Sequence, residues 1–394
     1  MNRIQELIKE LCPNGVEWKT LGEIGKISMC KRIMKNETSD SGDIPFYKIG
    51  SFGGIADSFI SRDLFEKYKK TYSYPKKGEI LLSASGTIGK SVIFDGSPSY
   101  FQDSNIVWIS NDEKVVFNKY LYYYYQIAKW NISSGGTIAR LYNDNLAKTP
   151  IQIPPLPVQT EIVRILDKFV EQQEQLEKLI ELRMKQYEYY REEMLTAKEG
   201  WETKTLGEIC DIKGRIGFRG YTREDQVKKG EGAISLSPGN IENSKLFFDD
   251  CAYISWDKYE ESPEIMVNLN DVIFCKTGST VGKVAIVTEL VEKTTINPQL
   301  VVLKNVQCSN KYLYYYLTRG EIQYDVKKFA GIGSVPNISQ EKLSGLTIKL
   351  PNEDIQNEIV KILDSFESSI SALTSALELS KKRYEHYRDE MLRF

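Results

Sequence analysis

The sequence predicts an α+β protein made of two copies of one unit, each a mixed, mostly β domain followed by a long helix. Three observations lead to this fold class. Matching segments occur in the same order in both halves, and each half ends in a long heptad pattern. Short apolar runs separated by glycine, proline, asparagine and aspartate fill the regions between, as is typical of strands and turns.

Four segments recur in both halves with an offset of 185 to 197 residues. They are WKTLGEIGKI and TKTLGEICDI from Trp18 and Thr203, KYLYYYYQ and KYLYYYLT from Lys119 and Lys311, QTEIVRILDKF and QNEIVKILDSF from Gln159 and Gln356, and KQYEYYREEML and KRYEHYRDEML from Lys185 and Lys382. Between these segments the two halves diverge. The pattern therefore predicts a repeated scaffold with one variable surface in each half, which suits two related domains holding two different ligands.

The first domain is predicted over residues 1–156 and begins with an amphipathic helix in MNRIQELIKEL. This start precedes the first TLGEI as the end of the central helix precedes the second, so the C-terminus is expected to lie near Met1. Proline-rich segments, TPIQIPPLPVQ and IKLPNEDIQ, end the two domains. The remaining limits are then 157–199 for the central helix, 200–350 for the second domain and 351–394 for the C-terminal helix.

A glycine-rich turn occurs once in each domain, as SASGTIGKS at residues 83–91 and KTGSTVGKV at residues 276–284. Both resemble a phosphate-binding loop, but the spacing of their glycines excludes that motif in both turns. The first glycine of that motif would have to stand where Ala84 and Thr277 stand. Because apolar runs flank both turns, the sequence predicts a strand–turn–strand hairpin in which glycine supplies a positive φ.

The two long helices carry a heptad seam. Steps of four and three from Ile162 meet an apolar or aromatic residue at eight of ten positions, and the same steps from Ile359 do so at nine of ten. This pattern is typical of a coiled coil. The two helices are expected to pair antiparallel, which would relate the two halves by a pseudo-twofold axis.

Composition excludes several classes of protein. The chain has 394 residues and an ordinary globular balance of 41% hydrophobic and 27% charged residues. No apolar run approaches the length of a membrane span, and no signal peptide is recognisable, so a cytoplasmic location is expected. The six cysteines form no CxxC pair, the one histidine stands alone, and no hydrolase or zinc-protease motif occurs. We therefore expect no catalytic site, metal site or bound cofactor in this chain.

Charge is unevenly distributed. The net charge is −2 for the whole chain, but residues 1–156 carry 20 basic and 16 acidic side chains, while the two long helices are acidic. Basic residues gather in the divergent stretches instead. DNA binding by the domains alone is expected to be weak, because phosphate neutralisation supplies most of the affinity, so a partner would have to add basic surface.

The arrangement resembles the specificity subunit of a type I restriction-modification system. The resemblance covers nearly the whole chain and is carried by CPNGVEWKTLGEI, the paired SGTIGK and GSTVGK turns, the segment from GGTIARLYNDNLAK to ILDKF with its partner GIGSVPNISQEKL to ILDSF, and the helix ends YREEML and YRDEML. It implies two target-recognition domains, each reading one half of a split sequence in double-stranded DNA. It further implies that two methyltransferase subunits dock on the helices and that restriction subunits join them. S-adenosylmethionine, ATP and Mg would then be bound by those partners, with no membrane involved.

Base recognition needs side chains on loops, with arginine or lysine facing guanine and asparagine or glutamine facing adenine. Candidates in the first domain are Lys31, Arg32, Ser85, Thr87, Lys90 and Arg140. Those in the second domain are Arg215, Arg219, Tyr221, Lys276, Thr277, Lys283 and Asn337. For each of them the alternative is that the side chain stabilises its own loop.

Arg140 and Asn337 follow equivalent glycine-rich loops, SSGGTIA and AGIGSVP. Two domains that read different half-sites would need side chains of different chemistry at equivalent positions, which these two residues provide. A protein–protein scaffold, in which two binding domains sit on a coiled-coil spacer, is the alternative function. The two hypotheses differ in one simple outcome, because a scaffold would enrich nothing from a random pool of duplex DNA.

Overall fold

The computed structural model describes the chain except for residues 1, 134–138, 216–221 and 332–334. The described residues form two compact units. The first unit comprises Met1–Glu177 together with Ser375–Phe394, and the second comprises Lys178–Thr374. Each unit therefore contains one domain and one stretch of each long helix.

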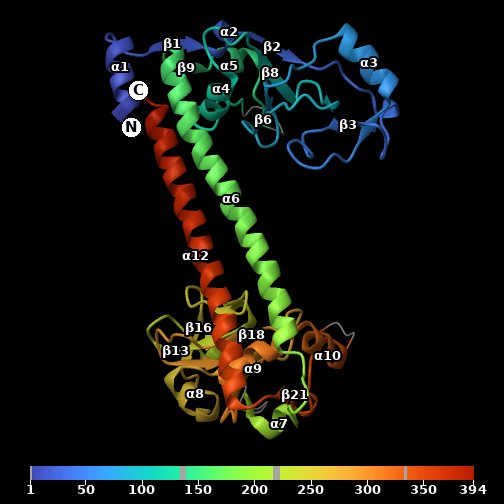
Figure 1. Cartoon of the computed structure of the whole chain (residues 1–394), viewed down its shortest axis with the longest axis vertical. Coiled ribbons are helices and arrows are strands. Elements are labelled where there is room, and N and C mark those ends of the chain that lie inside the picture. Colours follow the sequence, from blue (N-terminus) through green and yellow to red (C-terminus); the bar gives the residue numbers. More distant parts are fainter. Residues whose placement is uncertain (1, 134–138, 216–221, 332–334) are drawn as a thin grey trace. The chain divides into compact units, whose positions relative to one another are not determined.

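The described residues of the first unit form three small sheets, drawn with their helices in Figure 1. Their strands are β1 (Glu17–Thr20) with β9 (Pro150–Ile153); β2 (Lys26–Met29), β8 (Ile106–Ser110), β5 (Ile80–Ser83) and β6 (Ser91–Ile93); and β4 (Phe59–Ile60), β3 (Ile44–Tyr47) and β7 (Tyr100–Phe101). Its shorter helices are α1 (Asn2–Leu11), α2 (Leu21–Ile24), α3 (Arg62–Thr71), α4 (Asn118–Tyr125) and α5 (Asn143–Ala147), with a 3-10 turn at Lys35–Glu37. Pairing is antiparallel except between β3 and β7.

The described part of the second unit repeats the two-stranded ribbon and the central four-stranded sheet of the first, and its third sheet has four strands instead of three and is accompanied by a further two-stranded sheet. Its strands are β10 (Glu202–Thr205) with β21 (Thr347–Leu350); β11 (Asp211–Gly214), β20 (Leu300–Lys304), β17 (Val272–Cys275) and β18 (Val284–Ile286); β12 (Gln226–Val227), β16 (Ala252–Ser255), β13 (Gly232–Leu236) and β19 (Thr294–Ile296); and β14 (Ile241–Glu242) with β15 (Lys245–Leu246). Its shorter helices are α7 (Leu206–Ile209), α8 (Trp256–Glu260), α9 (Asn310–Leu317), α10 (Gly320–Ala330) and α11 (Gln340–Ser344), with 3-10 turns at Arg223–Asp225, Pro238–Asn240 and Pro263–Ile265. A parallel pair also recurs among the described strands, between β13 and β19.

Equivalent sheets thus occupy the same order in both units, β2-β8-β5-β6 in one and β11-β20-β17-β18 in the other. The repeated TLGEI segments explain one shared detail. Each forms a short helix closed by a capping box, in which Glu23 accepts a hydrogen bond from the Thr20 backbone at 2.7 Å and Glu208 does the same for Thr205. These hydrogen bonds lower the pKa of both glutamates. The prediction of one scaffold written twice is confirmed.

The long helices are α6 (Leu156–Met194) and α12 (Glu353–Met391). The predicted seam is confirmed by burial, because between residues 171 and 182 only Gln173, Leu176 and Ile180 are not exposed. Antiparallel pairing is visible within each unit. In the first, Phe169 stacks on Tyr387 and Glu177 pairs with Lys381, so rising numbers on α6 meet falling numbers on α12. In the second, Tyr190 stacks on Phe366 of α12, with ring centroids 5.5 Å apart.

Both chain ends lie in the first unit (Figure 1). Ile4 and Leu7 of α1 share one apolar core with Met391, the last position of the heptad pattern, and with Leu392. The backbone N–H of Phe394 also donates to the side chain of Gln152 in β9 at 3.1 Å. The expected circular organisation, with the C-terminus near the start of the chain, is therefore confirmed.

A repeated polar joint fixes each domain to the beginning of its long helix. In the first unit, Gln159 accepts from the backbone of Phe117 at 2.9 Å, and Asp167 accepts from Lys119 and Tyr123, both at 2.6 Å. The second unit repeats these contacts with the residues that the repeat aligns, which are Gln356, Ser309, Asp364, Lys311 and Tyr315. Burial and the adjacent aspartate raise the pKa of both tyrosines, so they remain donors.

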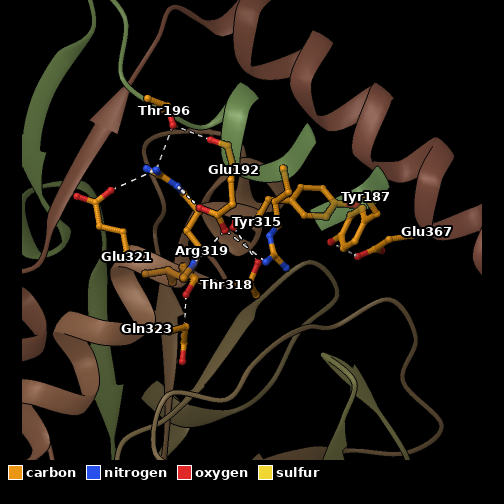
Figure 2. A network of polar contacts seen from close by, with 12 residues as sticks. Tyr187, Glu192, Thr196, Tyr315, Thr318, Arg319, Glu321, Gln323 and Glu367 are labelled. Atoms are coloured by element: carbon orange, nitrogen blue, oxygen red, sulfur yellow. Dashed lines mark hydrogen bonds and ion pairs between the residues drawn. The ribbon is translucent and has the colours of Figure 1, made fainter. Parts of the chain in front are cut away.

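The end of the other long helix meets the same domain. Figure 2 shows Glu192 of α6 beside Arg319, with Tyr187 directed toward Glu367 of α12. Glu192 also accepts from the backbone of Gly320 at 3.0 Å, at the start of α10. The side chain of Arg319 is 7% exposed and that of Glu192 is 40% exposed, so a buried guanidinium meets a carboxylate that water still reaches. The second domain is consequently held by both long helices.

We expect Asp364→Ala to lower the free energy of unfolding by about 1–3 kcal/mol, because it leaves the hydroxyl of Tyr315, which is 1% exposed, without its carboxylate acceptor. Denaturant unfolding of the full chain measures the change. Asp364→Asn keeps an acceptor and should lose less. The control is Glu181→Ala, which removes the exposed pair with Lys185 and should leave the midpoint nearly unchanged. Equal effects of Asp364→Ala and Glu181→Ala would contradict the importance of the joint.

Candidate nucleic-acid interface

The glycine-rich turns connect antiparallel strands, as predicted. Residues 84–90 join β5 to β6, and residues 276–283 join β17 to β18. Gly89 and Gly282 have φ values of 88° and 96°, a region that side chains with a Cβ rarely adopt. In both units the N–H of this glycine donates back across the turn, to the carbonyl of Ser83 or Cys275. The turn is thus a hairpin in both domains, and the phosphate-loop interpretation is excluded by structure as well as by spacing.

Each turn is paired with a distant segment of its own domain. Ser85 forms an isolated bridge with Arg140, and Thr277 forms one with Asn337. The hydrogen bonds beside these bridges also match, since Leu141 donates to the carbonyl of Ala84 at 2.8 Å and Ile338 donates to that of Lys276 at 2.9 Å. The sequence-based prediction that Arg140 and Asn337 occupy equivalent positions is confirmed.

In the first domain the candidate residues converge on the turn between β7 and β8. The side-chain oxygen of Asn105 accepts from Ser85 at 2.9 Å and from Arg140 at 2.7 Å. Arg32 forms an ion pair with Asp103 of the same turn at 2.9 Å. Ser104 between them has a φ of 55°. This turn therefore gathers side chains from three segments that lie far apart in the sequence.

In the second domain the corresponding cluster is built from uncharged side chains. The hydroxyl of Thr277 donates to the side-chain oxygen of Asn337 at 2.6 Å. Gln299, at the position of Asn105, accepts from the Lys276 backbone through its carbonyl at 2.9 Å and from the side chain of Asn297 at 3.1 Å. The scaffold is the same as in the first domain, but the polar groups that it presents are carboxamides rather than guanidiniums.

The lysine that ends each turn contacts the variable part of its own domain. Lys90 donates from Nζ to the carbonyl of Phe52, and Lys283 donates from Nζ to the carbonyls of Ile241 at 2.7 Å and Pro238 at 3.4 Å. The alternative assigned to these residues, loop stabilisation, thus has direct contacts in its favour. A phosphate contact by either lysine stays a prediction.

The other candidates lie in different surroundings. Lys31 is exposed with its ammonium over the ring of Tyr72, Thr87 is exposed in the first turn, and Lys276 is half-buried in the second. Arg215 is only 6% exposed, at the position that corresponds to Cys30 in the first domain, and this burial does not favour a contact with bases. Arg219 and Tyr221 lie outside the described residues.

Sequence reasoning missed the residues that organise the cluster, above all Asp103 and Asn105 in the first domain and Asn297 and Gln299 in the second. The candidates from the sequence are basic or hydroxyl-bearing side chains and one carboxamide, Asn337, and they do not include the acceptors that hold them in place. Aligning QDSNIVW before β8 with INPQLVV before β20 would have indicated them, because both stretches place polar residues at the start of an equivalent central strand.

Thiols next to the cluster have raised pKa values. Burial raises the pKa of Cys30 to about 12 and also raises that of Cys275, so both remain neutral near pH 7. Within the described parts of the chain, no group of histidine, cysteine and carboxylate side chains is arranged to hold a metal ion. In the same parts, no helix has the length and apolar character that crossing a membrane requires.

Comparison with protein families gives two matches along this chain. The model of the type I restriction modification DNA specificity domain matches residues 13–184 and again residues 198–379. A putative type I restriction enzyme specificity subunit of Haemophilus influenzae is 64% identical over 179 residues, covering 44% of this chain and 46% of that relative. The EcoR124I/EcoR124II specificity subunit of Escherichia coli is 30% identical over 411 aligned residues, covering 100% of this chain and 98% of that protein.

Solved structures share the fold. The S subunit of a type I restriction-modification system from M. genitalium aligns with a TM-score of 0.56 at 16% identity, covering 97% of both chains. A chain from a structure that describes complex assembly and conformational transition of the type I R-M system aligns with a TM-score of 0.58, also at 16% identity, covering 97% of this chain and 98% of that one.

We expect Lys90→Met to lower the free energy of unfolding by about 1 kcal/mol, because the carbonyl of Phe52 loses the ammonium that donates to it. Thermal unfolding of the full chain measures the loss. Lys35→Met removes the same charge from an exposed 3-10 turn of the same domain and is the matched control. If the two variants unfold at the same temperature, Lys90 does not stabilise the loop that contains Phe52.

Proposed function

Because this chain belongs to the type I restriction-modification DNA specificity family and carries two such domains, we propose that each domain recognises one half of a split sequence in double-stranded DNA. The observation that carries the proposal is the pair of equivalent clusters. Ser85 and Thr277 occupy one scaffold position, and Arg140 and Asn337 occupy the position bridged to it. Two domains that share a backbone arrangement and differ in these groups are suited to two different base sequences.

Sequence recognition also needs contacts to the DNA backbone, which fix the register of the protein. Lys31 is exposed near the first cluster, and Lys276 is half-buried in the turn of the second. Formal charge in the second domain is balanced, with 19 basic and 19 acidic side chains between residues 200 and 350. So few basic residues would give the domains only a modest, salt-sensitive affinity for DNA. This favours DNA binding by the chain as part of a larger complex.

We propose that catalysis takes place on partners. Two methyltransferase subunits would dock on the long helices and their domains, and restriction subunits would join that assembly in the cytoplasm. S-adenosylmethionine, ATP and Mg would be bound by these partners, while this chain acts without catalysis. The relatives' names, which are those of specificity subunits of restriction enzymes, support this division of roles.

Domain exchange tests the main proposal. Residues 21–149 can be replaced by the matching part of another family member, because Thr20 and Pro150 face each other at the end of the β1–β9 ribbon and the ribbon is retained. We expect one half of the methylated DNA sequence to change and the other to persist. Mapping of methylated adenines in cells that carry the chain and its methyltransferase gives the result.

The reciprocal exchange of residues 206–346 uses the equivalent ribbon, in which Thr205 faces Thr347, and should alter only the other half. A change in both halves after either exchange would contradict independent recognition. Loss of all sequence dependence with intact folding would favour the scaffold alternative instead.

The long helices are proposed to set the gap between the two half-sequences, since α6 and α12 both continue from one unit into the other. Adding one heptad after Leu176 and one after Leu373 lengthens the pair by about 10.5 Å and keeps the seam in register. We expect roughly three more unread base pairs, at about 3.4 Å of rise each, with both half-sequences preserved.

Methylation mapping again provides the measurement for the lengthened helices, and a gap longer by two base pairs would still agree. Insertion into one helix alone is the control, since it leaves an unpaired bulge and should reduce methylation. Undiminished methylation at the original gap would show that the helices do not determine it.

A further inference from the structure

We propose that the bridged residue of each domain is its principal base-reading side chain, so that Arg140 reads a guanine in one half-site and Asn337 reads an adenine in the other. This inference rests on the proposed function and adds to it the chemical identity of two bases. It also assigns a positioning role to Ser85 and Asn105 in the first domain and to Thr277 in the second.

The two positions are equivalent in backbone terms. Each residue pairs with the second residue after the central strand, Ser85 after β5 and Thr277 after β17. Each is followed by a residue whose N–H donates to the turn, Leu141 or Ile338, and both of these are buried. Because the neighbouring residue is hydrogen-bonded to the turn in both domains, Arg140 and Asn337 have equivalent backbone positions. They differ in the chemistry of their side chains.

Arg140 has the chemistry that suits guanine. Its Nη2 donates to Asn105 at 2.7 Å and to Ser104 at 3.4 Å. These contacts orient the guanidinium plane through Nη2. Both forks of an arginine, Nη1 with Nη2 and Nε with Nη2, use one hydrogen of Nη2, so guanine takes the place of the longer contact, the one to Ser104. A fork held in one plane matches the O6 and N7 acceptors of guanine, which lie side by side in the major groove.

Asn337 has the chemistry that suits adenine. Its side chain is exposed, and its oxygen accepts from the Thr277 hydroxyl at 2.6 Å. That hydrogen bond orients the carboxamide, and an amide oxygen has a second lone pair available. Adenine offers the N6 amino donor beside the N7 acceptor, which an asparagine can satisfy with its remaining oxygen lone pair and its amino group.

The supporting hydroxyl occupies the same place in both domains but acts differently. Thr277 contacts the reading residue directly, whereas Ser85 acts through Asn105, whose oxygen receives both Ser85 and Arg140. The difference follows from the length of the side chain. The longer arginine reaches Asn105, whereas the shorter asparagine contacts the hydroxyl of Thr277 itself. Asn105 is therefore a positioning residue for the guanidinium.

The experiment selects sequences from a randomised duplex pool with the full chain, both alone and co-expressed with the methyltransferase subunit of its system. Arg140→Gln should replace guanine by adenine at one position of one half-site. Asn337→Arg should make the opposite replacement at one position of the other. A bidentate contact discriminates bases by roughly 5- to 150-fold, so shifts of at least fivefold in base frequency are expected.

Matched controls make the same charge changes elsewhere in the same domain. Arg62→Gln removes a positive charge from the exposed start of α3, and Gln307→Arg adds one beyond the far end of β20, away from Gln299. Both should leave every base preference as it is, although affinity can change with salt.

The positioning role has its own readout. Asn105→Ala should weaken the guanine preference about fivefold or more while the other half-site is read as before, and Asn105→Asp, which keeps an oxygen acceptor for Arg140, should restore it. Thermal unfolding of the same variants separates positioning from folding. Equal loss of preference in Asn105→Ala and Asn105→Asp at unchanged stability would remove Asn105 from this role.

The outcomes separate the inference from the proposal beneath it. If the unaltered chain enriches no sequence in either form, the proposed DNA recognition is wrong. If it enriches a split sequence and neither Arg140→Gln nor Asn337→Arg changes a base, recognition stands and the assignment of these two readers is overturned. A change in the predicted half-site toward a different base would keep the position and reject the guanine or adenine assignment.

Discussion

The joint between each domain and the beginning of its long helix is the interaction on which the rest of the structure depends. The side chains of Gln159 and Gln356 each form hydrogen bonds with two other segments of the chain. Their side-chain oxygens accept from the segment before the tyrosine-rich helix, and their side-chain nitrogens donate to the carbonyls of Pro154 and Pro351. Both glutamines are buried, so an unmatched polar atom would be costly there. The joint thereby fixes the direction in which each helix leaves its domain, and it does so with the same atoms in both units.

That rigidity has a consequence for recognition. The central sheets end at the hairpin turns, and the polar clusters are attached to the turns through one bridge each. The apolar cores pack beneath, with Leu82 and Val107 in one and Phe274 and Val301 in the other. The polar side chains at each bridge contact one another, Ser85 and Arg140 through Asn105 and Thr277 directly with Asn337. The chemistry presented to a ligand can therefore change without repacking, which explains how one scaffold carries arginine at a position where its copy carries asparagine.

Much of this architecture could be predicted from the sequence, because its causes are local or periodic. The seam follows from spacing alone, and the hairpin follows from two glycines between apolar runs. The clusters could not be predicted in the same way, because Asn105 meets Arg140 across 35 residues and Arg32 meets Asp103 across 71. Arg215 illustrates the same limit. It directly follows β11, as Cys30 directly follows β2, and only its burial in the folded domain shows that this position points inward.

The polar residues in the seam show how the repeat departs from strict symmetry. Gln173 and Arg183 interrupt the pattern on α6, and Ser380 interrupts it on α12 at the position that corresponds to Arg183. Arg183 is accommodated by stacking over Phe366, at 5.6 Å from the ring centroid. An apolar residue at every step would permit several registers, whereas a polar residue that fits beside one partner favours a single register. The shared heptad pattern thus lets the two helices pair, and the polar residues favour one register of that pairing. The two domains likewise share a scaffold and differ locally in the polar side chains that they present.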